Sequence, residues 1–175
     1  MPINDLNALP EDSAVAELLH CCGSTRWARG MAAARPLPSL EAMSMTADRI
    51  WASLEPEDWL EAFRTHPRIG ESGGAGGADE AGEAGEAGAW SADEQAGVGS
   101  MTDAVGERLA KANREYEARF GYLFIVCATG KSAEEILAIL ERRLANGPGE
   151  ELRIAVEEQR KIMRLRLARL MDLGS

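Results

Sequence analysis

The sequence is poor in the residues that mark disulfide-stabilised and metal-binding proteins. It has three cysteines and two histidines among 175 residues, with no Cys-x-x-Cys pair and no cluster of Cys and His at ligand spacing. An odd number of cysteines, two of them adjacent at Cys21 and Cys22, does not form a disulfide framework. We therefore expect a protein of a reducing compartment, the cytoplasm, that binds no metal ion.

Lysine, aromatic side chains and long apolar runs are also scarce. Three of the 19 basic residues are lysine, and 29 acidic residues give a formal net charge of −10, which disfavours a nucleic-acid or anionic membrane partner. No apolar stretch approaches the length of a membrane span, and residues 1–5 lack the basic and apolar regions of a secretory signal. Aromatic residues make up 5% of the chain while alanine and leucine abound, which favours helices over sheets.

Length and apolar periodicity predict one all-α domain, a multi-helix bundle over residues 1–175. An apolar content of 45% is enough for a single sizeable core at this length. Helical spacing predicts helices that cover residues 10–23, 24–35, 39–54, 56–66, 102–120, 132–146 and about 150–171. Ser39 begins the third of these, and Ser132 with Glu135 forms a capping box at the start of a later one.

The composition changes sharply between Gly70 and Ala89. Eight of the chain's 18 glycines fall between Gly70 and Gly88, mixed with alanine and glutamate. Such a segment loses much backbone entropy on ordering and has little apolar area to bury. We expect residues 70–89 to form a flexible insertion within the domain, a surface loop or lid between the fourth and fifth helices. The stretch contains no GxxxxGK[ST] pattern, so it is not read as a phosphate-binding loop.

A His-Pro pair closes the helix that precedes the glycine-rich stretch. Pro67 disfavours the α conformation at His66 and cannot donate a backbone hydrogen bond, so the helix should end there. An imidazole held on a stiff corner is well placed to meet a ligand. An isolated His-Pro pair, however, is more often a histidine that only packs at a helix terminus.

The segment from Trp90 to Gln95 predicts that regular structure restarts after the glycine-rich stretch. Ser91-x-x-Glu94 matches a capping box, in which the hydroxyl and the carboxylate each accept a hydrogen bond from a backbone amide at a helix start. The spacing therefore offers helix capping as a structural interpretation of Glu94, the alternative to a catalytic role.

Residues 121–130 form the only stretch that is typical of buried extended chain. Glycines bound an apolar run that is rich in β-branched and aromatic residues. Because no second strand is available, its backbone groups need other partners, which could be caps, turns or a bound ligand. The alternative is a connector that crosses the core.

One arginine lies on the apolar face of the last predicted helix. At 100° per residue, Arg166 falls inside the arc of apolar positions, next to Ile162, Met163 and Leu170. A guanidinium there is costly unless it pairs with an anion, which could be an internal carboxylate or a ligand carboxylate. Snorkelling of the side chain to water is the third interpretation.

Four segments in order resemble a known family. They are residues 63–67 (Phe-Arg-Thr-His-Pro), 91–95 (Ser-Ala-Asp-Glu-Gln), 120–128 (Phe-Gly-Tyr-Leu-Phe-Ile-Val-Cys-Ala), and 151–153 with 161–167. Together they are similar to the OHCU decarboxylases, the 2-oxo-4-hydroxy-4-carboxy-5-ureidoimidazoline decarboxylases of urate degradation. The resemblance covers essentially the whole chain, although the glycine-rich stretch is longer than the family usually carries. It implies an all-helical domain, a homodimer, that converts OHCU to (S)-allantoin and carbon dioxide.

The resemblance also implies roles for individual residues. His66, Glu94 and Arg166 would be catalytic, with His66 as the general acid/base. Substrate contacts would come from Pro67, Ser91, Gln95, Phe124, Ile125, Val126, Cys127 and Ala128. OHCU carries its own electron sink, a ring C=N beside the carbon that loses carboxylate, so no cofactor is expected.

Two other functions stay open on the sequence alone. A hydrolase of ureido compounds would usually need a metal cluster, and the two histidines lie far apart without ligand spacing. A non-catalytic helical interaction module predicts that replacing His66 alters stability or partner binding but abolishes no reaction.

Overall fold

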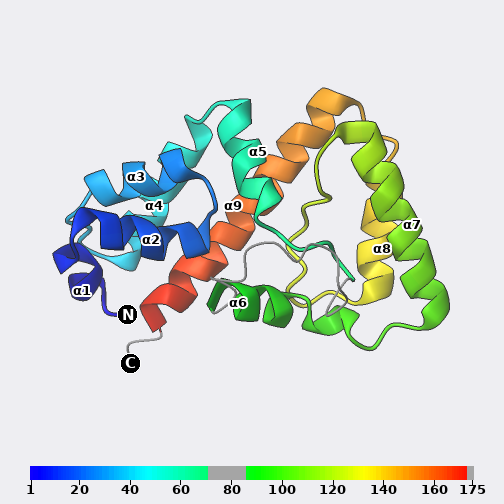
Figure 1. The fold of residues 1–175 in the computed structure, drawn as a ribbon, viewed down its shortest axis with the longest axis horizontal. Coiled ribbons are helices and arrows are strands. Elements are labelled where there is room, and N and C mark those ends of the chain that lie inside the picture. Colours follow the sequence, from blue (N-terminus) through cyan, green and yellow to red (C-terminus); the bar gives the residue numbers. More distant parts are fainter. Residues whose placement is uncertain (71–85, 173–175) are drawn as a thin grey trace. The chain divides into compact units, whose positions relative to one another are not determined.

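The computed structural model describes residues 1–70 and 86–172, and the structural statements below refer to these ranges. All regular elements in them are helical, as Figure 1 shows, which confirms the all-α fold class. The chain divides into two compact units, one made of Met1–Thr65 with the segment from Arg160 onward and the other made of His66–Gln159. The expectation of a single domain over residues 1–175 stays a prediction.

The first unit consists of five helices and the last part of a sixth. They are α1 (Ile3–Ala8), α2 (Glu11–Cys21), α3 (Thr25–Ala33), α4 (Leu40–Ala52), α5 (Pro56–Arg64) and the part of α9 (Pro148–Asp172) that follows Gln159. Helix α3 packs against α2, α4 and α5. Large apolar side chains fill this interior, among them the fully buried Trp27, Met31 and Phe63.

Helix α1 is a difference from the sequence analysis, which predicted no helix before residue 10. Leu6 is fully buried, and the Asn7 side chain exchanges two hydrogen bonds of 2.8 Å with the backbone of Leu37. These distant contacts stabilise a helix that is too short to be recognised by its periodicity. Because α1 adds one to the count, the glycine-rich stretch follows the fifth helix and not the fourth.

Two predicted helix starts are confirmed. The Ser39 hydroxyl accepts a hydrogen bond from the Ala42 amide at 3.1 Å, at the start of α4. At the start of α8 (Ala133–Arg143), Ser132 and Glu135 exchange hydrogen bonds of 3.2 Å and 2.8 Å in a capping box. These signals are local, which is why the sequence alone identified them.

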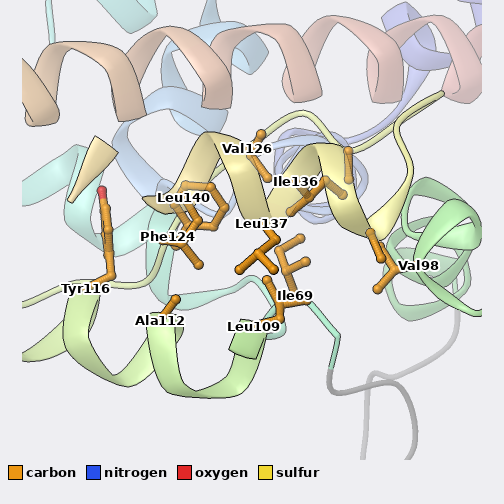
Figure 2. Packing of buried hydrophobic residues seen from close by; sticks show 12 residues of the cluster. Ile69, Val98, Leu109, Ala112, Tyr116, Phe124, Val126, Ile136, Leu137 and Leu140 are labelled. Carbon is orange, nitrogen blue, oxygen red and sulfur yellow. The ribbon is translucent and has the colours of Figure 1, made fainter. Parts of the chain in front are cut away.

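The second unit has its core between α7 (Asp103–Phe120) and α8, which pack against each other. Figure 2 shows this cluster. The loop that contains Ile69, the 3-10 helix η1 (Ala96–Val98) and the extended segment 121–130 also contribute to it. The buried side chains are Ile69, Val98, Leu109, Ala112, Tyr116, Phe124, Val126, Ala128, Ala133, Ile136, Leu137 and Leu140.

Helix α6 (Glu86–Glu94) corrects the prediction for Ser91 and Glu94. Both residues lie in the C-terminal part of the helix, so they do not form a capping box at its start. The i, i+3 spacing of a capping box also places two side chains on one face inside a helix, and the sequence does not separate the two cases. Residues 86–89, which were expected in the loop, belong to α6. The rest of the predicted loop, residues 71–85, lies outside the described residues.

Candidate functional site

His66 lies just beyond the end of α5, as the His-Pro pair predicts. The helix ends at Arg64, and Thr65 caps it with a hydrogen bond from its hydroxyl to the Ala62 carbonyl at 2.7 Å. The imidazole is half-buried and its Nε2 lies 2.6 Å from Oε1 of Gln159. Pro67 follows in non-helical conformation and is exposed.

The loop after Pro67 is fixed by two side-chain amides. Asn113 on α7 is buried and donates to the Ile69 carbonyl at 3.0 Å. The Gly70 amide donates to Oε1 of Gln95 at 3.2 Å. The second bond brings Gln95, a predicted substrate-binding residue, to a point four residues from His66 along the chain.

Helix α6 presents Ser91 and Glu94 on one buried face. Their exposed fractions are 9% and 7%, and the i, i+3 spacing places them one above the other. Burial raises the pKa of the half-buried Cys127 thiol, and the nearby carboxylates of Glu158 and Glu94 raise it further. Glu94 is therefore close enough to the extended segment to influence the charge of a side chain there.

The extended segment 121–130 contains neither helix nor strand, and side chains satisfy part of its backbone. Arg143 donates from Nη1 to the Ile125 carbonyl at 2.7 Å. The Cys127 amide donates to Oε2 of Glu158 at 2.7 Å, and Nζ of Lys131 donates to the Cys127 carbonyl at 2.9 Å. The prediction that this backbone finds partners other than a strand is confirmed.

Three predicted substrate-binding residues of this segment have side chains in the core. Phe124, Val126 and Ala128 belong to the buried cluster, and Figure 2 shows Phe124 and Val126 within it. A contact from these residues to a ligand would therefore come from the backbone. The Ile125 carbonyl and the Cys127 amide already have internal partners.

A buried ion pair supports the extended segment. Arg143 donates from Nε to Oε1 of Glu151 at 2.7 Å, and the two residues are 3% and 0% exposed. The Tyr116 hydroxyl donates to the same carboxylate oxygen at 2.5 Å, and Asn146 donates to the other oxygen at 2.9 Å. Burial and the hydrogen bond to Glu151 both raise the pKa of Tyr116. The Arg143 guanidinium also lies 4.7 Å from the centre of the Phe124 ring.

Arg166 is described within the first unit, whereas His66, Glu94, Gln95 and residues 124–128 are described within the second. It is 4% exposed on α9, and its Nη1 lies 3.5 Å from the His20 carbonyl oxygen at the end of α2. Burial raises the pKa of the adjacent Cys21 and Cys22 thiols, and the positive charge of Arg166 opposes this. The buried position of Arg166 agrees with the helical-face analysis.

Among the buried polar residues that were not predicted from the sequence are Gln159, Arg143 and Glu151. Two of them could have been found by the test that identified Arg166. At 100° per residue, Glu151 lies about 20° and Gln159 about 60° from Ile162, so both fall on the apolar face of α9. Arg143 carried no such signal, because it follows Arg142 in the last turn of α8, where basic residues are ordinary.

Two other kinds of site are not found among the described residues. Within residues 1–70 and 86–172, no three His, Cys, Asp or Glu side chains form a group that could hold a metal ion. Among the helices of the same ranges, none combines the length and apolar character that crossing a bilayer requires. The expectation of no metal and no cofactor stays a prediction.

Known proteins are similar to this chain over most of its length. The "Uric acid degradation bifunctional protein TTL" of Arabidopsis thaliana is 37% identical over 153 residues, which are 87% of this chain and 45% of that protein. The chain thus spans less than half of that relative. The 2-oxo-4-hydroxy-4-carboxy-5-ureidoimidazoline decarboxylase of Haloferax volcanii is 27% identical over 170 residues, which are 96% of this chain and 95% of that one.

A solved structure and a family model agree with these relatives. A crystal structure of OHCU decarboxylase in the presence of (S)-allantoin superimposes with a TM-score of 0.74 at 34% identity, over 89% of this chain and 97% of that one. The family model described as OHCU decarboxylase matches residues 7–168, which include most of both units. The chain therefore belongs to the OHCU decarboxylase family.

Proposed function

We propose that this chain is a carboxy-lyase that converts OHCU to (S)-allantoin and carbon dioxide in urate degradation, without a cofactor. The match of the family model to residues 7–168 is the observation that carries the proposal. The relatives named as OHCU decarboxylases and the 34% identical crystal structure support it. The half-buried His66 on its proline corner supplies a group suited to the chemistry.

The reaction depends on proton transfer and charge stabilisation more than on covalent catalysis. The bond from C4 to the carboxylate breaks, and its electron pair moves toward the neighbouring C=N of the substrate. The C4 hydroxyl loses its proton as it becomes the ring carbonyl, C5 gains a proton, and the former imine nitrogen gains another, so that one net proton is taken up for each carbon dioxide released. An enzyme contributes by orienting the substrate, moving these protons and favouring one face for protonation.

We assign these tasks to the candidate residues as follows. His66 acts as general acid/base at the substrate hydroxyl or at the intermediate that follows loss of carbon dioxide. Glu94 binds the ureido or ring N–H groups or orients the imidazole, with Ser91 beside it on α6. Arg166 holds an anionic or carbonyl oxygen of the substrate, an interaction that helps the rate only if it is stronger in the transition state.

The remaining contacts would recognise the amide edges of the substrate. Gln95 and the backbone of residues 124–128, apart from the already bonded Ile125 carbonyl and Cys127 amide, would provide donors and acceptors. Pro67 would provide an exposed apolar surface next to His66. The fixed backbone of the extended segment supports this role, because Arg143 and Glu158 hold it on both sides of Val126. A rigid array of donors and acceptors suits a polar substrate that carries several amide groups.

Further expectations from the resemblance belong to the same proposal. They are a homodimer, a cytoplasmic location, a small-molecule substrate with no nucleic-acid or membrane partner, and one domain that comprises both units. The continuity of α9 through Gln159 and Arg160 supports the single domain. Light scattering of the purified chain would test the dimer.

A coupled assay tests the proposed activity. OHCU is generated freshly from urate with urate oxidase and hydroxyisourate hydrolase, and the chiral product is followed by circular dichroism. We expect rapid formation of (S)-allantoin, and a loss of about 10²- to 10⁴-fold in kcat for His66→Ala because general acid/base catalysis contributes about that much. Formation no faster than the spontaneous background would overturn the proposal and favour a non-catalytic interaction module.

A further inference from the structure

Gln159 is a fully buried amide in the middle of α9. Glutamine is mostly exposed in folded proteins, and a buried polar group costs free energy unless it is hydrogen-bonded. The Gln159 side chain is 0% exposed, and its Oε1 lies 2.6 Å from Nε2 of His66. Within the described residues its own Nε2 has no hydrogen-bond partner. The contact with the imidazole is therefore the hydrogen bond that compensates the burial of this amide.

The chemistry of the two atoms fixes which of them donates. An amide oxygen has no hydrogen and only accepts, so Nε2 of His66 must carry the proton in this contact. In a neutral imidazole only one ring nitrogen carries hydrogen, and the lone pair is then on Nδ1. When the ring is protonated, the same amide oxygen still accepts from Nε2.

We propose that Gln159 is the positioning residue that sets the tautomer and ring orientation of His66, so that Nδ1 is the nitrogen that exchanges a proton with the substrate. The proton exchange with the substrate rests on the proposed function, whereas the tautomer of His66 does not. The tautomer decides which ring nitrogen of His66 reacts. If the proton were on Nδ1, the unprotonated nitrogen would be Nε2.

A second contact of α9 supports a positioning role for this part of the helix. The neighbouring residue, Glu158, accepts the Cys127 amide at 2.7 Å. Two successive residues of one helix therefore hold two candidate parts of the site, the His-Pro corner and the extended segment. A helix is a rigid support, which keeps such contacts in fixed geometry.

The tautomer is measurable by long-range ¹H–¹⁵N correlation spectroscopy of the full ¹⁵N-labelled chain. The chain has two histidines, so His20 serves as the internal reference and a His66→Ala sample assigns the signals. We expect Nε2 of neutral His66 to be protonated and Nδ1 to be unprotonated. A His66 that carries its proton on Nδ1 would overturn the proposal.

Two substitutions test whether Gln159 is the cause. Gln159→Met removes the acceptor while it retains an unbranched, helix-compatible side chain, and it also removes the unpartnered buried donor. We expect the ¹⁵N shifts of His66 to move toward those of an unconstrained imidazole. We also expect kcat to fall roughly 10-fold with little change in KM, as for groups that orient metal-bound histidines. Gln159→Glu restores an acceptor, so Nε2 should again be protonated.

Asn113→Leu is the matched control. Asn113 is also a buried amide, and it holds the same loop through the Ile69 carbonyl. Its replacement should lower stability but leave the ¹⁵N shifts of His66 unchanged. If Gln159→Met leaves both the shifts and kcat as in the wild type, Gln159 is only structural and the proposal is wrong. If the wild-type chain does not act on OHCU, the proposed function fails, and the spectra still decide the tautomer.

Discussion

The two units differ in what they bury. Among the described residues, the buried polar side chains of the second unit are Ser91, Glu94, Asn113, Arg143, Glu151 and Gln159, whereas those of the first unit are Ser24 and Arg166. Ser24 has a local task, since it accepts from the Trp27 amide at the start of α3. The first unit is held mainly by apolar helix faces, and its ion pairs at Asp48 retain access to water.

This difference follows from the secondary structure of each unit. Helices satisfy their own backbone and can pack through apolar faces. The second unit contains a loop and an extended segment whose backbone needs partners, and the side chains of Asn113, Arg143 and Glu158 supply them. The candidate residues His66 and Cys127 lie in these irregular segments. A polar interior is thus the means by which non-helical backbone is placed accurately in a helical protein.

The largest expected effect is at the buried ion pair of the second unit. Arg143→Ala leaves the Glu151 carboxylate buried without its cation, and breaking such a pair typically costs about 3–5 kcal/mol of unfolding free energy. Urea denaturation measures this. The matched control is Arg108→Ala, which breaks an exposed pair with Glu141 and should cost less than about 1 kcal/mol. Equal losses in the two variants would contradict the comparison.

The thiols of the first unit should make its stability depend on pH. Burial raises the pKa of Cys22 from 9.0 to about 12, so the unfolded chain loses this proton at lower pH than the folded chain. The contribution to stability is therefore fully present below pH 9 and is lost between pH 9 and about 12, at up to about 1.4 kcal/mol per pH unit.

Urea denaturation at pH 8 and pH 10.5 under reducing conditions tests this slope. Wild-type chain should lose about 2 kcal/mol more between the two pH values than Cys22→Ala, because the variant lacks one titrating thiol. Parallel losses would show that the Cys22 thiol is not buried as described. Comparing slopes instead of absolute values removes the cost of the missing side-chain volume.

Helix caps should contribute equally in the two units. Ser39→Ala in the first unit and Ser132→Ala in the second each remove a hydroxyl that accepts a backbone amide. Each should cost about 1 kcal/mol, because a cap acts locally and does not depend on the surrounding interior. Urea midpoints of the two variants give the comparison. A clearly larger loss for one of them would show that its cap also serves tertiary packing.

The smallest effect is expected at Asp48 in the first unit. Its carboxylate pairs with Arg160 and Arg164, whose side chains are 29% and 46% exposed. Asp48→Asn should lower the unfolding free energy by less than about 1 kcal/mol, and the loss should shrink in high salt because exposed charges are screened. Thermal unfolding at low and high salt measures both. A loss as large as that of Arg143→Ala would remove the distinction between the two interiors.

The sequence predicted those features that short-range rules determine. The end of α5, the caps at Ser39 and Ser132, and the burial of Arg166 all follow from residues within one or two helical turns, whereas α8 ends at Arg143, three residues before the predicted end. The extended segment was recognised because glycines bound an apolar run. The fold class followed from the same local patterns.

Features that depend on distant contacts were missed or misread. Helix α1 relies on contacts with Leu37, and the spacing of Ser91 and Glu94 fits both a helix start and a helix interior. The bond between His66 and Gln159 joins residues that are 93 positions apart, so no local pattern reveals it. Helical-face analysis could have identified Gln159 as buried, but not its partner.

The division of the chain has a consequence for synthesis on the ribosome. The second unit is one continuous stretch, whereas the first unit combines Met1–Thr65 with residues that follow Gln159. Contacts such as that between the Met1 amino group and the Leu170 carbonyl cannot form until the last part of α9 has been translated. The unit that begins first therefore finishes last. Until then the first unit lacks four of its buried apolar residues, Ile162, Met163, Leu167 and Leu170, and an incomplete core of this kind exposes apolar surface that favours aggregation.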